Sequence, residues 1–235
     1  MHLLLQRGYE VHVIDNVERG RSGFAPGHWP HGPIMRTMEE TWDLFRIGSR
    51  DNFAKRASFP GSQFPVEAID ALARSIVPRW LSTNPLQVDG LCAVLRKTGP
   101  AILICHSQGG EISSDAASRI PELVEGIIGI EPSSFRDEAR SFRNIPLVFL
   151  KGDYLDRQER WIARNKEWDS IAAGINRIGG MARVVDTVSE VSPGGSHNLM
   201  MDRHNEECLD VALEALGKFL AESRTSLRTS EANNR

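Results

Sequence analysis

AILICHSQGG, from Ala101 to Gly110, is the stretch of sequence that decides the fold. It opens with an unbroken apolar run, which is typical of a strand buried on both faces of a parallel sheet. Ser107 follows this run, and Gly109 and Gly110 come two and three positions later. A serine in a sharp strand-to-helix turn sits in strained backbone and needs small neighbours. The stretch therefore predicts a strand, a tight turn carrying Ser107 and the first turn of a helix.

Ser107 has two interpretations. The residues around it depart in one position from the G-x-S-x-G form of nucleophile turns, since Cys105 stands in place of the first glycine. A serine between a strand and a helix can also simply cap the helix. We favour the nucleophile because of residues that lie further along the chain.

Length and composition describe an ordinary globular domain. The 235 residues suit one domain with ample chain for a core. A net charge of −3 without a run of Lys and Arg gives no support for a nucleic-acid partner or an anionic membrane. No apolar run approaches the length of a membrane span. The three widely spaced cysteines fit reduced thiols, and His28 and His31 lack further ligands at metal-binding spacing.

The pattern of the first residues is typical of the middle of a fold and not of its start. Residues 1–9 resemble a helix end closed by Gly8, and their apolar core is too short for a signal peptide. Residues 10–15 alternate and then run apolar, which predicts a strand. A turn containing Gly20 and Gly23 is expected to follow it.

Residues 24–84 are irregular and rich in proline, glycine and aromatic side chains. Apolar residues three and four apart predict amphipathic helices over 39–45 and 66–80. The aromatic residues fit a lid over an apolar pocket or, equally, a small peripheral core. They are Trp29, Trp42, Phe45, Phe53, Phe59, Phe64 and Trp80.

Helices and strands alternate from residue 88 onward. Helices are predicted over 88–97, 111–119, 158–178 and 206–222, and strands before Ser107 and over 125–130, 145–150 and 182–188. This alternation is typical of an α/β domain, in which helices cover both faces of a mostly parallel sheet. We expect a single domain over residues 1–222, with residues 24–84 as an insertion and 223–235 as a frayed, disordered tail.

Several polar side chains each follow a predicted strand. Ligands bind at the carboxyl ends of parallel strands, so these side chains are expected at one edge of the sheet. A serine becomes a nucleophile when a histidine takes its proton and a carboxylate holds that histidine. Such chemistry needs no cofactor and no metal. The residues are Ser107, Glu131, Asp153, Asp156 and His197.

The order serine, acid, histidine is that of the α/β-hydrolases, which the chain resembles over nearly its whole length. The resemblance rests on the turn at Ser107, on His197 late in a glycine-rich loop and on the turn at residues 19–22. HSQ from His106, IEP from Ile130 and GSHNLMMDR from Gly195 are similar to a subgroup of bacterial-type esterases.

The resemblance implies roles for these residues. In that subgroup the acid is a glutamate after the strand that follows the nucleophile strand, which implies Glu131. The commoner plan of the superfamily implies Asp153 or Asp156 instead, and we favour Glu131. Glu131 and Asp153 can also cap turns, and His197 can be a loop histidine bonded to backbone. His106 is expected to point away from the pocket.

The backbone N–H of Gln108 is expected to donate to the oxyanion, and the second donor normally comes from a loop after the third strand of the superfamily. By resemblance, residues 10–15 are the fourth strand, and the third strand and its loop are missing. Either the two remaining strands pair directly or the chain is part of a longer one, which we favour. An upstream extension can carry a secretion signal, so a soluble, cytoplasmic location is expected only for the chain as it stands.

The expected function is hydrolysis of a small-molecule carboxylic ester through an acyl-enzyme on Ser107. Two alternatives stay open. One is a catalytically silent ligand-binding protein on the same fold, and the other is a lactone or amide hydrolase. The acyl group, the alcohol group and the oligomeric state are not specified by these patterns.

Overall fold

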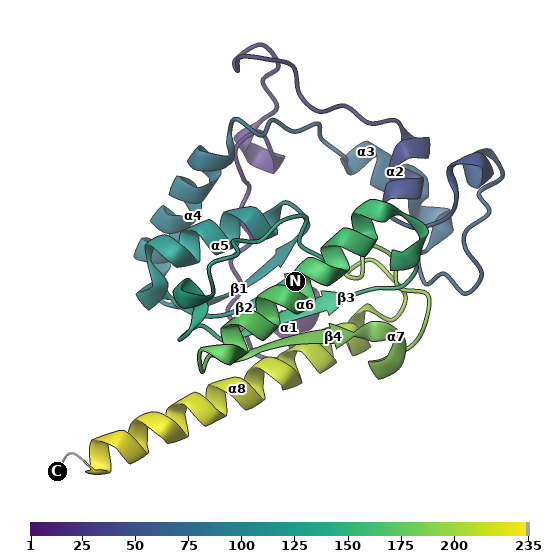
Figure 1. Ribbon diagram of the computed structural model, residues 1–235. Coiled ribbons are helices and arrows are strands. Elements are labelled where there is room, and N and C mark those ends of the chain that lie inside the picture. The colour runs from purple at the N-terminus through teal and green to yellow at the C-terminus, as the bar shows by residue number, and fades with distance from the viewer. Residues whose placement is uncertain (234–235) are drawn as a thin grey trace.

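Four parallel strands form the centre of the molecule (Figure 1). The structure is a computed structural model that describes the backbone of residues 1–233 and the side chains of residues 1–223 and Thr225. Neighbouring strands lie in chain order, and every pairing between them is parallel. The prediction of an α/β fold with a mostly parallel sheet is confirmed. The strands are β1 (Ala101–His106), β2 (Val124–Ile130), β3 (Leu147–Lys151) and β4 (Ala182–Asp186).

Side chains of each strand enter two separate cores. Successive residues of a strand point to opposite faces, so Ile127 and Phe149 pack into one core while Ile128 and Val148 pack into the other. The continuous apolar runs in the sequence are the consequence, because a strand covered on both sides has no solvent face.

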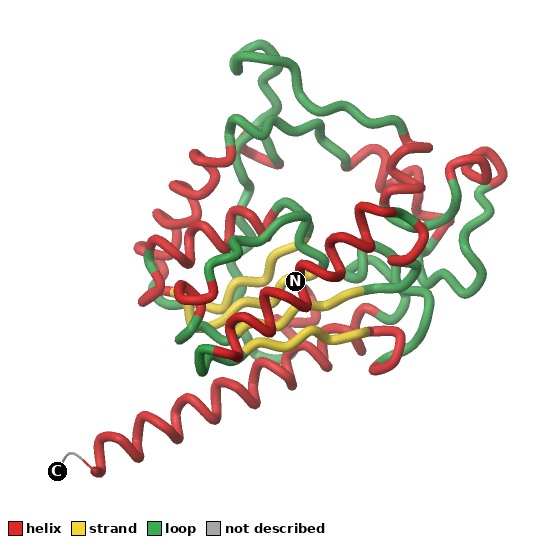
Figure 2. The backbone as a smooth tube through the Cα atoms, in the orientation of Figure 1, coloured by secondary structure: helices red, strands yellow, loops and turns green. Residues whose placement is uncertain are grey.

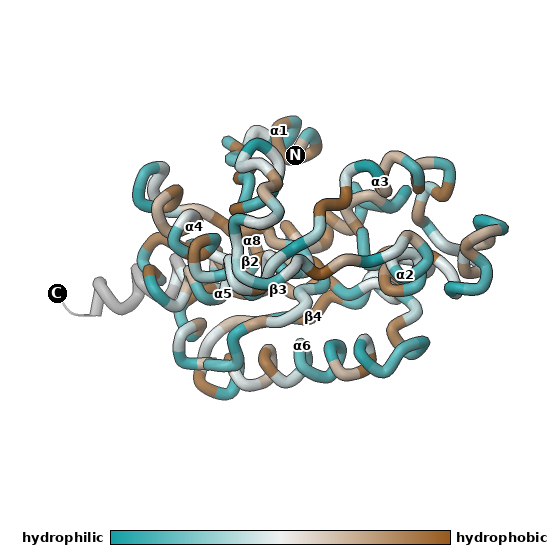
Figure 3. Tube along the Cα trace, turned by 90° about the horizontal axis from the view of Figure 1, so that it is seen from above, coloured by the Kyte–Doolittle hydropathy of each residue, from teal (hydrophilic) through white to brown (hydrophobic). Residues whose placement is uncertain are grey.

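Helices cover both faces of the sheet, as Figures 1 and 2 show. The first core contains residues of α4 (Asn84–Thr98), α5 (Gly109–Arg119) and α6 (Glu159–Arg177). The second core contains residues of α8 (Asn205–Asn233). Figure 3 shows that hydrophobic and hydrophilic residues alternate along α6, as expected for a helix with one face on a sheet.

The strand predicted over residues 10–15 is wrong. The segment follows α1 (His2–Gln6) but has no strand assignment, and Val13 is 69% exposed. This segment and β1 line the same cavity, and the segment does not pair with β1. β1 is therefore the edge strand of the described sheet, and its Ile104 is 40% exposed. An apolar alternation forms a strand only when a neighbouring strand supplies hydrogen-bond partners, and none does so here.

Residues 24–84 contain a small core of their own. It is formed by the buried side chains of Trp42, Ile47, Phe64, Ile69 and Leu72. The two helices are α2 (Met38–Leu44), which begins at a Thr37–Glu40 capping box, and α3 (Ile69–Ser75). The helix predicted over 66–80 ends at Ser75 because the chain turns extended at Ile76, shortly before Pro78.

The remaining helical elements are short, except at the carboxyl end. α8 continues to Asn233, so the part of the expected 223–235 tail that the structure describes is helical and not disordered. No helix within residues 1–233 combines the length and apolarity that a membrane span requires. The short elements are α7 (Thr187–Glu190) and 3₁₀ turns at Gly20–Ser22, Arg50–Lys55, Val66–Ala68, Pro121–Leu123, Ala139–Phe142 and Leu155–Arg157.

Candidate active site

Ser107 occupies a sharp turn between β1 and α5. Its φ of 52° lies in the left-handed region, which is strained for a residue with a side chain. The Ser107 N–H still donates to Ile130 O at 3.2 Å, and Ser107 O accepts from Ser133 N at 2.9 Å. The turn is therefore held on both sides by the end of β2.

Small residues are required around this turn. A Cβ on Gly110 would lie 2.2 Å from Pro132 Cβ, which no packed side chain tolerates. A Cβ on Gly109 would lie 3.3 Å from Cys105 Cβ. Cys105 is thus accommodated in place of the usual glycine because the position facing it lacks a side chain.

Glu131 is completely buried at the end of β2 and also has a positive φ, of 42°. Its Oε2 is hydrogen-bonded to His197 Nδ1 at 2.7 Å. Its Oε1 accepts from Gly152 N at 2.6 Å and from the guanidinium of Arg46, which is equally buried. The carboxylate is therefore fully hydrogen-bonded and charge-balanced within the protein.

The ring of His197 is enclosed by other rings. Ring centroids of Trp161, Phe45 and His106 lie 4.6, 5.2 and 4.5 Å from it. The backbone N–H of His197 donates to Phe45 O at 2.9 Å, and His106 Nε2 is hydrogen-bonded to the backbone O of His197 at 2.9 Å. The expectation that His106 points away from the site is wrong, since its ring packs against His197 and lines the same cavity.

The two alternative acids lie elsewhere. Asp153 accepts from Gly194 N at 2.8 Å through Oδ2 and so anchors the loop that carries His197. Asp156 is exposed, and its Oδ1 lies 3.8 Å from Arg157 Nε. Neither aspartate is hydrogen-bonded to His197 within the described residues.

The electrostatics of the buried groups follow from their partners. Burial alone would raise the pKa of Glu131, but the charge of Arg46 and the hydrogen bond from His197 bring it to about 2. Burial lowers the pKa of His197, against the opposing effect of Glu131. Burial and the neighbouring His197 lower the pKa of His106 to about 3. At neutral pH the site therefore holds an ionised carboxylate beside uncharged imidazoles.

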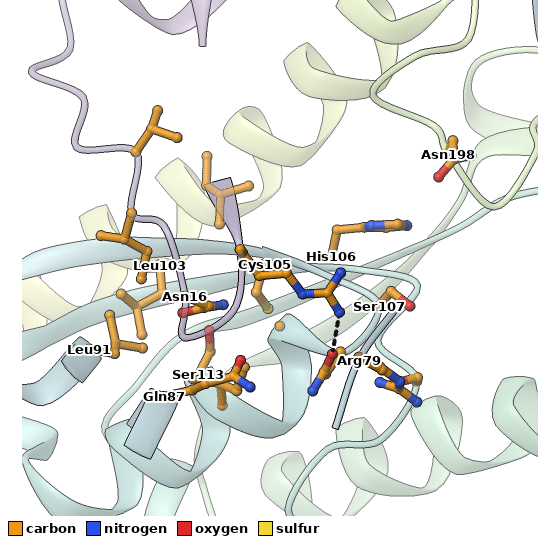
Figure 4. A pocket seen from close by; sticks show the side chains of 18 of the residues that line it. Asn16, Arg79, Gln87, Leu91, Leu103, Cys105, His106, Ser107, Ser113 and Asn198 are labelled. Carbon is orange, nitrogen blue, oxygen red and sulfur yellow. Dashed lines mark hydrogen bonds between the residues drawn. The ribbon is translucent and has the colours of Figure 1, made fainter. Parts of the chain in front are cut away.

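Ser107 and His197 line one cavity of about 1260 Å³. Figure 4 shows Ser107, His106 and Arg79 among the side chains of its wall. Within the described residues no hydrogen bond reaches Ser107 Oγ, and the backbone N–H of Gln108 has no acceptor. A serine hydroxyl and a free N–H donor are thus both available to a molecule in the cavity. No three His, Cys, Asp or Glu side chains in the described part of the chain converge as metal ligands.

The sequence did not reveal Arg46, whose buried guanidinium donates to both Glu131 and Asp153 O. Its only signal is an arginine that stands between the apolar residues Phe45 and Ile47. Trp161 packs on both Arg46 and His197, with the guanidinium carbon 4.3 Å from its ring centroid. The hydrophobic pattern of the sequence is consistent with burial of both residues, but it does not indicate which polar groups they contact.

The chain is similar to known esterases and lipases. A solved structure described as a novel bacterial esterase superposes with a TM-score of 0.74 at 27% identity, over 85% of this chain and 63% of that one. A probable secreted lipase, phiG, from a fungal species is 26% identical over 55% of this chain and 37% of its own length. Lipase LipV of Mycobacterium tuberculosis is 28% identical over 41% of this chain and 38% of its own length. The chain thus spans less than two thirds of each of these proteins. No protein-family model matches it.

Proposed function

Since this chain is a member of the α/β-hydrolase superfamily, we propose that it hydrolyses carboxylic esters, with Ser107 as nucleophile, His197 as base and Glu131 as acid. The observation that carries the proposal is the 2.7 Å hydrogen bond from His197 Nδ1 to the buried Glu131, beside a strained serine in the same cavity. The commoner acid positions, Asp153 and Asp156, are occupied otherwise or exposed.

The hydrogen bond to Glu131 determines which nitrogen of His197 takes up a proton. A carboxylate can only accept, so His197 carries its hydrogen on Nδ1 and keeps Nε2 free to take a proton. His197 Nε2 takes the proton of Ser107 Oγ as the Oγ–carbonyl bond forms. The ester C–O bond then breaks, and the imidazolium returns this proton to the leaving alcohol. Water attacks the acyl-enzyme by the same route and releases the acid and free Ser107.

The oxyanion of each tetrahedral intermediate needs a donor that is in place before reaction. The Gln108 N–H follows the nucleophile directly and has no acceptor within the described residues. Loss of one such donor typically costs about 3 kcal/mol of transition-state stabilisation. The Gln108 side chain is held by Asn84 Oδ1 at 2.8 Å, which steadies the residue that carries the donor.

Labelling with a fluorophosphonate tests this proposal, because the probe reacts with any activated serine. We expect one labelled peptide, the one containing Ser107, and loss of the label in Ser107→Ala and His197→Ala. Ser189→Ala, which removes a surface serine bonded to Asp186 O, is the matched control and keeps the label.

A folded wild-type protein that is not labelled contradicts the serine-hydrolase proposal and favours a silent binding protein. A labelled protein is then compared on matched ester, lactone and amide substrates. Faster turnover of the lactone or the amide than of the ester would contradict the ester assignment alone.

A further inference from the structure

Four arginines from four separate parts of the chain line the cavity that holds Ser107. They are Arg19, Arg36, Arg79 and Arg160, and we call them the cavity arginines. Within the described residues, none of them lies within ion-pair distance of a carboxylate. This concentration is unusual for a chain with a net charge of −3, whose other arginines repeatedly form ion pairs.

Two of the cavity arginines are positioned close to the nucleophile. The Arg19 guanidinium donates to Val77 O at 2.5 Å and to the Gln108 side chain at 3.4 Å, and Gln108 follows Ser107 directly. Burial lowers the pKa of His197 against the effect of Glu131, and the charge of Arg160 contributes to this lowering. One arginine is therefore hydrogen-bonded to the residue after Ser107, and the charge of another acts on His197.

The other two are brought together by backbone pairing. An isolated antiparallel bridge joins Ile34 to Arg79, with Ile34 N donating to Arg79 O at 2.7 Å. Arg36 lies two residues beyond this bridge. Burial lowers the pKa of Arg79, with Glu111 opposing the effect and the charge of Arg36 adding to it. The arginines thus act on one another across the cavity.

The acidic side chains of the cavity lie away from this cluster. Glu125 is at the amino end of β2, where Ala101 pairs with Val124, whereas Ser107 follows the carboxyl end of β1. Glu10 is hydrogen-bonded to His12 at 2.9 Å. Glu111 does not line the cavity and accepts from Asn84 and Ser133. The wall around Ser107 is therefore cationic, and Glu111 offsets part of the charge of Arg79 without pairing with it.

We propose that the cavity arginines form an anion subsite, and that the preferred substrates are esters that carry a second, ionised oxyanion group such as a carboxylate. The inference rests on the proposed function, whose nucleophile shares the cavity. Guanidinium groups offer paired N–H donors that match carboxylate and phosphate oxygens. A cleft lined by one sign of charge also concentrates ligands of the opposite sign.

Two substrates of nearly equal size test the subsite. 4-Acetoxybenzoate carries a carboxylate, and 4-acetoxybenzamide is its neutral counterpart. We expect the wild type to favour the benzoate by about tenfold or more in kcat/KM at low ionic strength. The preference falls as salt is added, because salt screens charges.

The ratio of the two kcat/KM values separates the subsite from general damage. Arg79→Gln lowers this ratio about tenfold, whereas Arg143→Gln, an exposed arginine outside the cavity, leaves it at the wild-type value. A ratio near one in the wild type, or an unchanged ratio in Arg79→Gln, overturns the inference even when Ser107 is labelled by the fluorophosphonate.

Binding supplies a readout that does not depend on turnover. Calorimetry with Ser107→Ala is expected to show tighter binding of 4-acetoxybenzoate than of 4-acetoxybenzamide, and the double variant Ser107→Ala/Arg79→Gln loses the difference. Displacement of the bound benzoate by glutarate or by inorganic phosphate shows which oxyanion the subsite prefers. Equal binding of benzoate and benzamide overturns the subsite, whereas an anion preference without serine labelling overturns only the proposed hydrolase function.

Discussion

The guanidinium of Arg46 holds the Oε1 side of the Glu131 carboxylate, while Oε2 is left to His197. Both side chains of this ion pair are fully buried. A buried ion pair of this kind is strongly destabilised when one partner is removed, because the remaining charge stays in the core. The pair also sets how basic His197 is, since the charge of Arg46 opposes the effect of Glu131 on the pKa of His197.

Arg46→Gln is expected to move the acid limb of the pH–rate profile to higher pH. Removal of the positive charge lets Glu131 raise the pKa of His197, so the imidazole protonates, and ceases to act as a base, at a higher pH. The profile of kcat/KM against pH measures the shift. An unchanged acid limb contradicts the effect of Arg46 on the pKa of His197. Arg50→Gln, which removes an exposed charge 3.8 Å from Glu40, is the control.

Arg46→Gln is also expected to destabilise the fold by about 3–5 kcal/mol, because it leaves Glu131 without its cationic partner. Urea unfolding at pH 7 measures this change. The control Arg50→Gln is expected to change the free energy of unfolding by less than about 1 kcal/mol, as is usual for exposed pairs. A similar loss of unfolding free energy in both variants would mean that the buried ion pair stabilises the fold no more than the exposed one.

Glu131 is expected to make stability depend on pH in the acid range. Its folded pKa of about 2 lies below its ordinary value of 4.5. The stabilisation is therefore complete above the ordinary pKa and is lost as pH falls from about 5 through 2. Its size is on the order of 3 kcal/mol.

The comparison of wild type with Glu131→Gln by urea unfolding across this range isolates the contribution, since all other acidic groups are common to both proteins. The wild type is expected to lose more stability on acidification than the variant. If the unfolding free energies of the two proteins change in parallel with pH, the lowered pKa of Glu131 is contradicted.

The assignment of the acid is tested by comparing carboxylate variants. Glu131→Gln keeps the shape but removes the charge that orients His197, and a drop in kcat of about 10³–10⁴ is expected. Asp156→Asn, at an exposed position, is expected to change kcat by less than about twofold. The measurement is steady-state ester hydrolysis by folded proteins, verified by circular dichroism. The reverse order of effects would favour the common superfamily position.

Gly110→Ala is expected to abolish labelling of Ser107 and to destabilise the protein by at least about 1–3 kcal/mol. The added methyl would lie 2.2 Å from Pro132 Cβ, so the segment after Glu131 must move. Gly90→Ala is the matched control, because this helical position is exposed and has open space around it. It is expected to raise stability by about 0.5–1 kcal/mol. Retained labelling in Gly110→Ala would contradict the need for close packing at this turn.

Patterns carried by neighbouring residues were enough to predict much of the fold. The apolar runs before Ser107 and Glu131 became β1 and β2, and the amphipathic spacing after Gln158 became α6. Two of the strand and helix predictions failed, one for want of a distant partner and one at a local break in the chain. Residues 10–15 have a strand-like pattern but no neighbouring strand, and the helix after Val66 stopped early where the backbone turned extended.

The sequence by itself determined that a serine, several carboxylates and a histidine follow the strands of a parallel sheet. Only the tertiary structure decided that Glu131 meets His197, that Arg46 is buried beside them and that the cavity arginines face one space. The physical reason is the separation in sequence of the residues that determine each feature. Strand and helix patterns follow from the backbone geometry of adjacent residues, whereas charges such as those of Arg19, Arg79 and Arg160 gather only after the chain between them has packed.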